Sequence, residues 1–392
     1  MKYFKLLLLI AVLMLPHIGR AQSSFYAFNG FIESLTSTAE YPSIKGRLFD
    51  QEFHGRINSQ WYPARSLRGE ADLRARFFYG ESVEKIPNFL DQLKVGYPFV
   101  NLDAVLWDRE KTIGYLQIDR FWLDYTTGEL ESTGGRQRIA WGTALVWNVI
   151  DLFNPKSVLD FDYEEKPGSD AFRLQYYTGA VSKIDAAAMP AKTFKRSTVA
   201  GLCSYNKFGY DFYAIGGVRN DRWVAGGAWA GSILKAGFRG EFLVSESPSA
   251  ENSPFGPVSA FWSDNPFVGA VLSADYTFPS SFYIHTEVLY YSNGKKANSG
   301  LYQIASLEAD MLSPARWSIY QEFSGNLNPL TKATIFAIFN PDDKSSIFVP
   351  MLTNSVATNL DLLVIGLLAA GNQNSEYNSY GSSAYVRLKY SF

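Results

Sequence analysis

The chain closes with the sequence Ala384-Tyr385-Val386-Arg387-Leu388-Lys389-Tyr390-Ser391-Phe392. Its even-numbered positions are all apolar or aromatic, and its odd-numbered positions carry hydroxyl or basic groups. Because successive side chains of a β-strand point to opposite faces, this alternation predicts a strand with one apolar and one polar face.

The same alternation recurs along the chain. It is found in residues 53–61, 70–79, 172–180, 234–244 and 282–291. Each run is close to the roughly 9–11 residues that a tilted strand needs to cross a bilayer. Some connections between the runs are short turns, whereas 245–265 and 371–382 are long and rich in polar residues and glycine, and we expect these two to be exposed loops.

The first 21 residues differ from the rest of the chain. Lys2 and Lys5 precede an apolar run, and Gly19-Arg20-Ala21 forms a small-x-small cleavage site. This pattern predicts a signal peptide over 1–21 and a mature chain of 22–392, which we expect to form one domain. The mature chain has no run of about 20 apolar residues that could form a membrane-spanning helix, since its best candidate, Leu360–Ala370, is too short and contains Asp361. A closed barrel is the other structure that satisfies its own backbone groups in lipid.

Composition narrows the class further. With 47% hydrophobic and 19% charged residues the chain is not disordered, and 36 Lys+Arg against 38 Asp+Glu speak against a nucleic-acid partner. The single cysteine excludes an intramolecular disulfide and a multi-cysteine metal site. Alternation alone does not show which face lies inside, so a secreted β-sandwich is an alternative. The 16% of aromatic residues, several at strand ends, fits the interfacial girdles of a membrane barrel. We therefore predict an all-β, transmembrane, antiparallel up-and-down β-barrel of about 16 strands, within a range of 14 to 18.

The end of the last strand, Tyr390-Ser391-Phe392, resembles the C-terminal signal of Gram-negative outer-membrane proteins. In those families the terminal strand is recognised by the barrel-insertion machinery. The resemblance implies the outer membrane as location, and outer-membrane lipid and that machinery as partners.

The most distinctive motif is Gly135-Arg136-Gln137-Arg138-Ile139-Ala140-Trp141-Gly142, followed by Asp151-Leu152-Phe153-Asn154-Pro155. It resembles the G-R-Q-x-x-x-W-G … N-P segment of porin-like outer-membrane families, a broad group that includes alginate-export-type barrels. The resemblance implies a barrel with a pore, and it carries over Arg136, Gln137, Trp141, Gly142, Asn154 and Pro155 as the positions of interest.

Residues 143–169 interrupt the strand pattern yet stay partly apolar, and they contain an acidic cluster at 160–165. Such a segment is packed rather than free in water. It is either a constriction element inside the barrel or an ordinary extracellular loop. In the first case it faces a basic ladder of inward arginines, and the pore-lining or constriction candidates are Arg74, Arg76, Arg136, Gln137, Arg138, Trp141, Asp151, Asn154 and Arg173. The arginines either pair with carboxylates across strands or contact the solute.

Catalysis is not expected, because the mature chain has only His54 and His285 as histidine bases, and Ser292 lies too far along the chain from His285 to match the outer-membrane phospholipase motif. No cofactor or metal is expected either. The sequence predicts a porin-like channel for the passive passage or export of small hydrophilic or saccharide-type solutes. The alternative is a structural or adhesive barrel that binds a partner through its long loops. Both a monomer and a homotrimer remain open.

Overall fold

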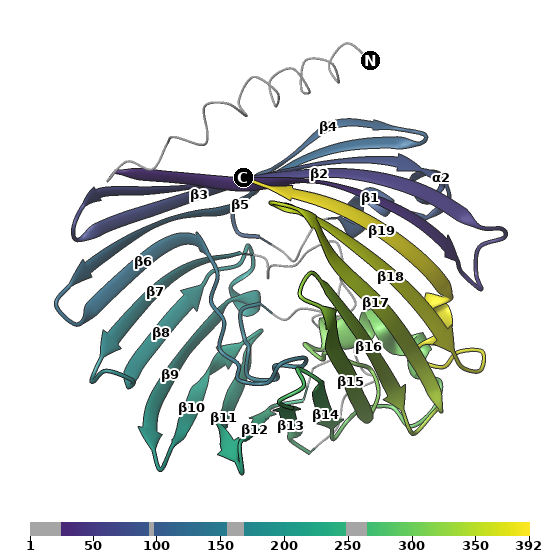
Figure 1. Cartoon of the computed structure of the whole chain (residues 1–392). Coiled ribbons are helices and arrows are strands. Elements are labelled where there is room, and N and C mark those ends of the chain that lie inside the picture. Colours follow the sequence, from purple (N-terminus) through teal and green to yellow (C-terminus); the bar gives the residue numbers. More distant parts are fainter. Residues whose placement is uncertain (1–24, 94–97, 155–167, 248–264) are drawn as a thin grey trace.

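The computed structural model describes residues 25–93, 98–154, 168–247 and 265–392. In these ranges the chain forms one antiparallel sheet of 19 strands (Figure 1). The strands are β1 (Tyr26–Glu40), β2 (Leu48–Ala64), β3 (Leu67–Gly80), β4 (Asp103–Arg109), β5 (Thr112–Thr127), β6 (Leu130–Gln137), β7 (Ser169–Tyr177), β8 (Lys183–Met189), β9 (Thr198–Lys207), β10 (Tyr210–Arg219), β11 (Arg222–Ile233), β12 (Ala236–Ser245), β13 (Phe267–Thr277), β14 (Tyr283–Tyr291), β15 (Trp317–Asn328), β16 (Thr331–Asn340), β17 (Ser345–Ala357), β18 (Leu360–Ala370) and β19 (Ser382–Ser391). Short helical segments lie between them: α2 (Glu81–Lys85), α3 (Phe89–Gln92), η1 (Phe194–Arg196), η4 (Ser299–Tyr302), α4 (Gln303–Glu308) and η5 (Asn378–Tyr380).

The sheet closes on itself because β1 pairs with both β2 and β19. Ile32 lies opposite Gly55 on one side and Tyr390 on the other. The predicted all-β antiparallel barrel is therefore confirmed.

The predicted number of about 16 strands is too low. Eighteen of the described strands form the closed wall, at the upper limit of the expected range, and β4 is an additional strand that pairs with the first half of β5. The period-2 signal fades in several wall strands for physical reasons. β18 is apolar on both faces because Ile365 and Leu367 pack inside the barrel, and β11 contains the pair Gly226-Gly227, which has no side chains to alternate.

The polar faces point into the barrel. On β3, Arg74 and Arg76 are buried inside the ring, whereas Leu73 and Tyr79 are exposed on its outer side. A soluble sandwich would show the reverse, with apolar side chains inside and charges in water. The face of the sheet that carries the charge thus decides between the two β architectures in favour of the membrane barrel.

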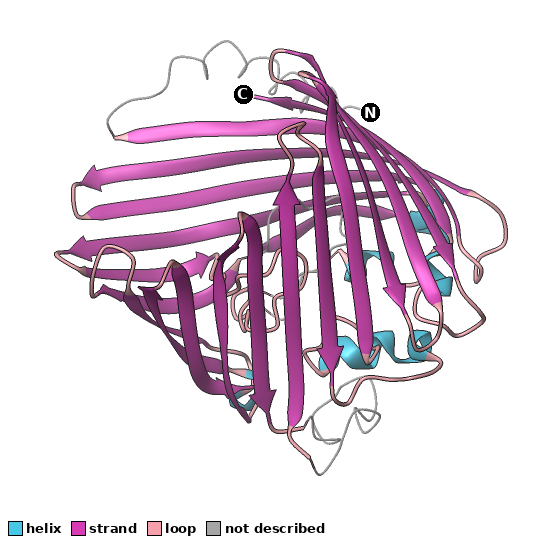
Figure 2. Ribbon diagram, turned by 60° about the horizontal axis from the view of Figure 1, so that its bottom comes forward, coloured by secondary structure: helices cyan, strands magenta, loops and turns pink. Residues whose placement is uncertain are grey.

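The two ends of the barrel differ. At one end the described connections are short turns such as Arg65-Ser66, Phe208-Gly209, Leu234-Lys235 and Thr358-Asn359. The other end carries the long connections and all of the described helical segments (Figure 2). In porins the long connections are extracellular. None of the described helices is long and apolar enough to cross a membrane.

Exposed aromatic side chains gather on the outer side near both ends. Tyr26, Trp61, Tyr125, Tyr176, Tyr205 and Tyr390 lie toward the short turns, and Phe49, Tyr79, Trp223, Trp317, Phe339 and Phe348 lie toward the long connections. This is the distribution of interfacial girdles.

The expected exposure of 371–382 holds for 371–374 but is wrong for the middle of the segment. Ser375, Glu376 and Tyr377 are buried, because this connection packs against residues 299–313 and against the ends of β16 and β17. Of the other expected loop, 245–265, residues 248–264 lie outside the described residues, as does the predicted signal peptide.

Candidate functional site

The connection after β6 turns into the barrel. Figure 1 shows it running inside the ring of strands toward β12 and β14. Its described part, residues 138–154, buries eight apolar side chains: Ile139, Trp141, Ala144, Trp147, Val149, Ile150, Leu152 and Phe153. They belong to one apolar cluster with inward side chains of the far wall, among them Leu243, Val271, Leu289 and Tyr320. We call residues 138–154 the inward segment.

The inward segment is irregular, so its backbone N–H groups have no strand or helix partners and need other acceptors. Glu241 on β12 supplies one. Its buried carboxylate accepts hydrogen bonds from the backbone N–H groups of Thr143, Ala144 (2.9 Å) and Ile150 (3.3 Å), and the hydroxyl of Thr143 also donates to it.

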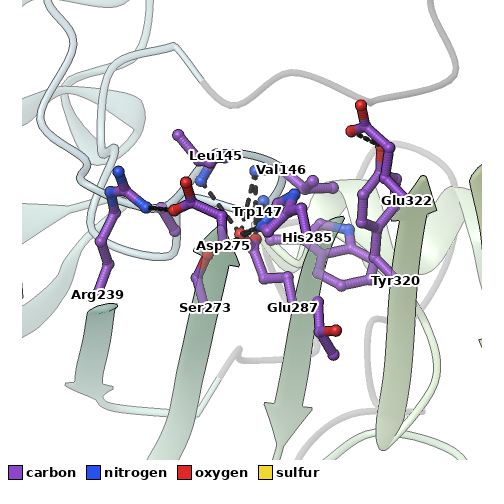
Figure 3. Close-up of polar contacts among 12 residues, drawn as sticks. Leu145, Val146, Trp147, Arg239, Ser273, Asp275, His285, Glu287, Tyr320 and Glu322 are labelled. Carbon is purple, nitrogen blue, oxygen red and sulfur yellow. Dashed lines mark hydrogen bonds and ion pairs between the residues drawn. The ribbon is translucent and has the colours of Figure 1, made fainter. Parts of the chain in front are cut away.

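Glu287 on β14 supplies a second acceptor. Its carboxylate receives the backbone N–H groups of Leu145, Val146 and Trp147 at 3.1, 3.3 and 2.6 Å (Figure 3). Together, the two wall carboxylates accept six backbone N–H groups from residues 143–150 of the inward segment. Hydrogen bonds to a charged acceptor contribute about 1.5–3 kcal/mol each, and the buried charges would be costly without these donors.

The beginning of the inward segment is fixed to β7 and β8. The indole N–H of Trp141 donates to Asp185 Oδ2 at 3.1 Å. Asp185 also forms a two-pronged ion pair with Arg173, with Nε–Oδ1 and Nη2–Oδ2 separations of 2.9 and 2.5 Å. Arg173 therefore holds the carboxylate that anchors Trp141. The guanidinium of Arg173 is occupied by this ion pair.

The end of the described segment is fixed by Asn154 and Asp151. Asn154 donates from its side chain to the carbonyl of Ile139 at 2.5 Å and accepts from the Ser169 hydroxyl at 2.8 Å. Its backbone N–H donates to Asp151 Oδ1 at 3.1 Å. Both ends of the segment are thereby drawn together where the chain leaves β6 and re-enters β7.

Each residue of the Gly135-Arg136-Gln137 motif has a local structural role. Gly135 has φ +119° and lies against the backbone of Phe121, where a Cβ would collide. Gln137 points inward and donates to the carbonyls of Thr133 and Ala171, both at 3.1 Å.

Arg136 lies on the outer face of the wall, and the prediction that it points inward is wrong. It is opposite Phe121 on β5 and Asp170 on β7, and the latter shares its face with the exposed Phe172. Its guanidinium pairs with Asp170 at 2.7 Å and donates to the carbonyls of Ile118 (3.1 Å) and Val100 (2.6 Å). Strict alternation explains the difference, because Gln137 takes the inward position beside it.

Arg74 points inward as predicted but is part of a buried chain of polar groups. It donates from Nε to His54 Nε2 at 2.8 Å, and His54 Nδ1 lies 2.8 Å from Glu33 Oε1. A ring nitrogen that accepts from a guanidinium carries no proton, so this arrangement requires neutral His54 with its proton on Nδ1. Beside it, Arg56 pairs with Asp72 and Asp119, both at 2.8 Å. Arg56 is thus a partner of carboxylates, whereas Arg74 reaches Glu33 only through His54.

Arg76 and Arg138 differ from this pattern. Arg76 points inward, donates to the carbonyl of Leu93 at 3.1 Å, and lies over the rings of Phe78 and Tyr115. Arg138 is exposed and makes no ion pair with the residues that the structure describes. The predicted ladder is therefore not a single row opposite the inward segment. Its acidic counterpart at 160–165 lies outside the described residues.

Sequence reasoning missed the residues that hold the inward segment. Glu241, Glu287 and Asp185 are single carboxylates at inward positions of otherwise ordinary strands. Their inward position was readable from the alternation. The partners of Glu241 and Glu287, however, are mainly backbone N–H groups 91 to 142 residues away, which leave no signal in the sequence. Asp185 accepts the indole N–H of Trp141, 44 residues away, and pairs with the nearer Arg173.

Ser273, His285 and Glu287 lie together but not as a catalytic relay. The Ser273 hydroxyl is 3.0 Å and Glu287 Oε2 is 3.4 Å from the same ring nitrogen, Nε2 of His285 (Figure 3). A relay requires the nucleophile and the carboxylate on opposite ring nitrogens. In addition, Glu287 is occupied by the inward segment and all three side chains are buried.

Two further connections pack together at the end of the barrel with the long connections. Glu376 accepts from the Ser313 hydroxyl at 2.7 Å and from Asn340 Nδ2 at 2.9 Å, and its burial raises its pKa to about 7. Asp310 pairs with Arg219 at 2.9 Å and with Arg222, which tie it to the turn between β10 and β11. These contacts hold 292–316 and 371–381 against the wall.

No protein-family model and no curated protein matches the sequence. Among solved structures, the chain is similar to OccAB4 of Acinetobacter baumannii, with a TM-score of 0.58 and 7% identity over 95% of this chain and 99% of that chain. It is similar to the outer membrane protein OprD of Pseudomonas aeruginosa, with a TM-score of 0.57 and 9% identity over 95% of each chain. It is also similar to OccAB1 of Acinetobacter baumannii, with a TM-score of 0.57 and 9% identity over 95% of this chain and 99% of that chain. By fold, the chain is a closed β-barrel similar to these proteins, of which OprD is an outer membrane protein.

Proposed function

We propose that this protein is an outer-membrane channel through which small hydrophilic solutes pass passively. The observation that carries the proposal is the inward segment, held by Glu241 and Glu287 inside a closed wall whose inner face carries charged side chains such as Arg56, Asp119 and Asp185. A segment fixed on one side of a lumen narrows it, and a narrowed, charged lumen selects solutes by size and polarity. The fold shared with OprD, which is an outer membrane protein, supports the location.

The state of the inward arginines bears on the solute. Arg56, Arg74 and Arg173 are each paired with a carboxylate or hydrogen-bonded to a wall residue. Paired charges attract a free anion weakly, so we infer uncharged hydrophilic solutes, including saccharide-type ones, rather than strongly anionic ones. Alginate is a polyanion, so the resemblance to alginate-export-type barrels concerns the barrel and not this solute class, and it stays a prediction.

Single-channel recording tests the proposal. The refolded mature protein is inserted into a planar bilayer, and conductance and reversal potential are measured in a salt gradient. We expect discrete conductance steps, with weak ion selectivity. Uptake of neutral saccharides of increasing size into proteoliposomes then gives the size limit. Protein that is folded and inserted but carries no current, and admits no solute, contradicts the proposal and favours the structural or adhesive alternative.

That alternative relies on long exposed loops. One of the two, 371–382, packs against 299–313 instead of extending from the barrel. This retraction weakens the alternative, although 248–264 lies outside the described residues.

A further inference from the structure

The barrel wall is short between β5 and β9. β6, β7 and β8 contain 8, 9 and 7 residues, whereas β3 and β5 contain 14 and 16. Residues 99–102, which lead into β4, lie against the outer side of this short wall, and a groove of about 680 Å³ runs between them and the connection 190–197.

The largely buried pair Arg136–Asp170 fixes one side of the groove. Arg136 donates to the carbonyl of Val100, and the N–H of Val100 donates to Asp170 Oδ2 at 2.9 Å. The segment 99–102 is therefore attached to the wall by charge-assisted contacts of the pair, and the groove is a built feature rather than a gap between loose loops.

The floor of the groove follows from the register of the outward side chains. Gly134, Phe172, Ala188 and Val199 are successive neighbours across four strands and share the outer face. Small residues at the first and third positions leave depressions between the large ones. Phe121 and Phe194 line the sides.

The groove lies at the level of the outer aromatic girdle. Val199 is opposite Val218, and Val218 is opposite Trp223, an exposed member of that girdle. The connection 190–197 is at the end with the long connections, which faces the cell exterior in porins. The groove therefore opens into the outer leaflet of the membrane.

The connection 190–197, which forms one side of the groove, carries three basic residues. Lys192, Lys195 and Arg196 flank Phe194, which lines the groove and is 91% exposed. Lys192 and Lys195 are both exposed, and the nearest acidic partner of Lys195, Asp221, is 3.8 Å away and equally open to solvent. An exposed pair of this kind is weak and leaves the ammonium available to a stronger anion.

We propose that this groove binds an acyl chain of a phosphate-bearing glycolipid of the outer leaflet, with Lys192 and Lys195 on its phosphate. The lining is almost wholly apolar and gives a polar solute no hydrogen-bond partners, whereas a hydrocarbon chain fills it without loss. Basic side chains at the headgroup level attract anionic lipid. The inference rests on the outer-membrane location in the proposed function, but not on conduction through the lumen.

Lipid binding to the purified, folded full-length mature protein tests the proposal. Native mass spectrometry of the protein in mild detergent gives the apparent Kd for lipid A, for dephosphorylated lipid A, and for lipid A in the presence of inorganic phosphate. Ala188→Trp fills the groove floor. Lys192→Glu with Lys195→Glu reverses the charge at these two positions. The matched control is Ala274→Trp, which places the same ring on the outward face of β13, far from the groove. Heat-modifiable migration on a gel confirms that each variant is folded.

We expect Ala188→Trp to weaken binding of both lipid forms at least tenfold, and Ala274→Trp to leave it unchanged. The double charge reversal is expected to weaken binding of lipid A by roughly tenfold or more, because each basic residue near an anionic headgroup contributes separately. It should change binding of dephosphorylated lipid A little. Inorganic phosphate should not displace the lipid. Binding by Ala188→Trp equal to the wild type, equal losses in both tryptophan variants, or equal effects of the charge reversal on lipid A and dephosphorylated lipid A overturns the proposal. Conductance of the same variants, recorded in parallel, separates this outcome from failure of the channel proposal.

Discussion

Glu287 and Trp147 are 140 residues apart in the sequence, yet the carboxylate of the first accepts the backbone N–H of the second at 2.6 Å inside the barrel. Together with the N–H groups of Leu145 and Val146, this contact fixes the middle of the inward segment to the far wall. The carboxylate of Glu287 therefore fixes the position of the inward segment in the lumen, and it is not available to a solute.

Glu287→Gln tests this role. The amide retains one neutral acceptor oxygen for three donors, so we expect the inward segment to open more often. Losing about 1.5–3 kcal/mol of the free energy that holds the segment in place should raise its amide hydrogen exchange at 143–150 by roughly 10- to 100-fold. Channel current should become noisier as the segment moves. The measurements are hydrogen exchange by mass spectrometry and single-channel recording.

Glu322→Gln is the matched control for that experiment. Glu322 is on the neighbouring strand β15, points to the same side, and accepts from the Tyr320 hydroxyl at 2.9 Å. In Glu322→Gln, amide exchange at 143–150 and the noise of the channel current should match those of the wild type. Equal effects of the two variants would mean that luminal charge, rather than attachment of the segment, governs the current.

Asp185→Asn and Trp141→Phe should differ in cost. Removing the carboxylate of Asp185 leaves Arg173 largely buried without its partner, for which we expect a loss of about 3–5 kcal/mol. Trp141→Phe removes one neutral donor and keeps the ring contact with Phe153, at a cost of about 1 kcal/mol. Urea unfolding in detergent micelles measures both. A cost for Trp141→Phe equal to that of Asp185→Asn would show that the indole, not the ion pair, holds the segment.

Arg138 and Arg136 are two positions apart but should affect conduction differently. Arg138 is exposed without an ion pair among the described residues, so Arg138→Gln is expected to shift the reversal potential toward cation selectivity. Arg136 is on the outer face and holds Val100, so Arg136→Gln should leave the reversal potential unchanged and loosen residues 99–102. Reversal potentials and hydrogen exchange distinguish the two. A shift with Arg136→Gln alone would refute this assignment of faces.

Glu376 should make one connection sensitive to pH. Its pKa is raised by burial from 4.5 to about 7, so the folded state binds this proton more tightly than the unfolded state does. The corresponding stability is present below about pH 4.5 and is lost as the pH rises through 7. Amide exchange at 371–381 should therefore increase between pH 5 and about 8, after correction for the intrinsic rate.

Glu376→Gln keeps the shape of that side chain and cannot ionise. Its exchange at 371–381 should be independent of pH over the same interval. A pH dependence that persists in this variant would show that Glu376 is not the group responsible.

The sequence by itself determined the architecture. Alternation in runs such as 70–79 and 384–392 specified strands of membrane-crossing length, and it correctly separated the face of Arg74 from that of Leu73. This succeeds because the period of a strand is local and needs no knowledge of distant residues. The same reasoning undercounted the wall strands where the interior is filled, as on β18, because buried apolar side chains on the inner face erase the alternation.

Tertiary structure alone decided what the charged residues do. Arg136 and Gln137 are adjacent in the sequence. Arg136 holds residues 99–102 on the outer face of the wall, whereas Gln137 fixes the end of β6 from the inner face. The interruption predicted at 143–169 begins earlier, directly after β6 ends at Gln137, and ends where β7 begins at Ser169. Its attachment to Glu241 and Glu287 depends on closure of the barrel, which brings β12 and β14 across from β6. Backbone N–H groups are the same in every residue except proline, so the sequence contains no mark of which of them a distant carboxylate will accept.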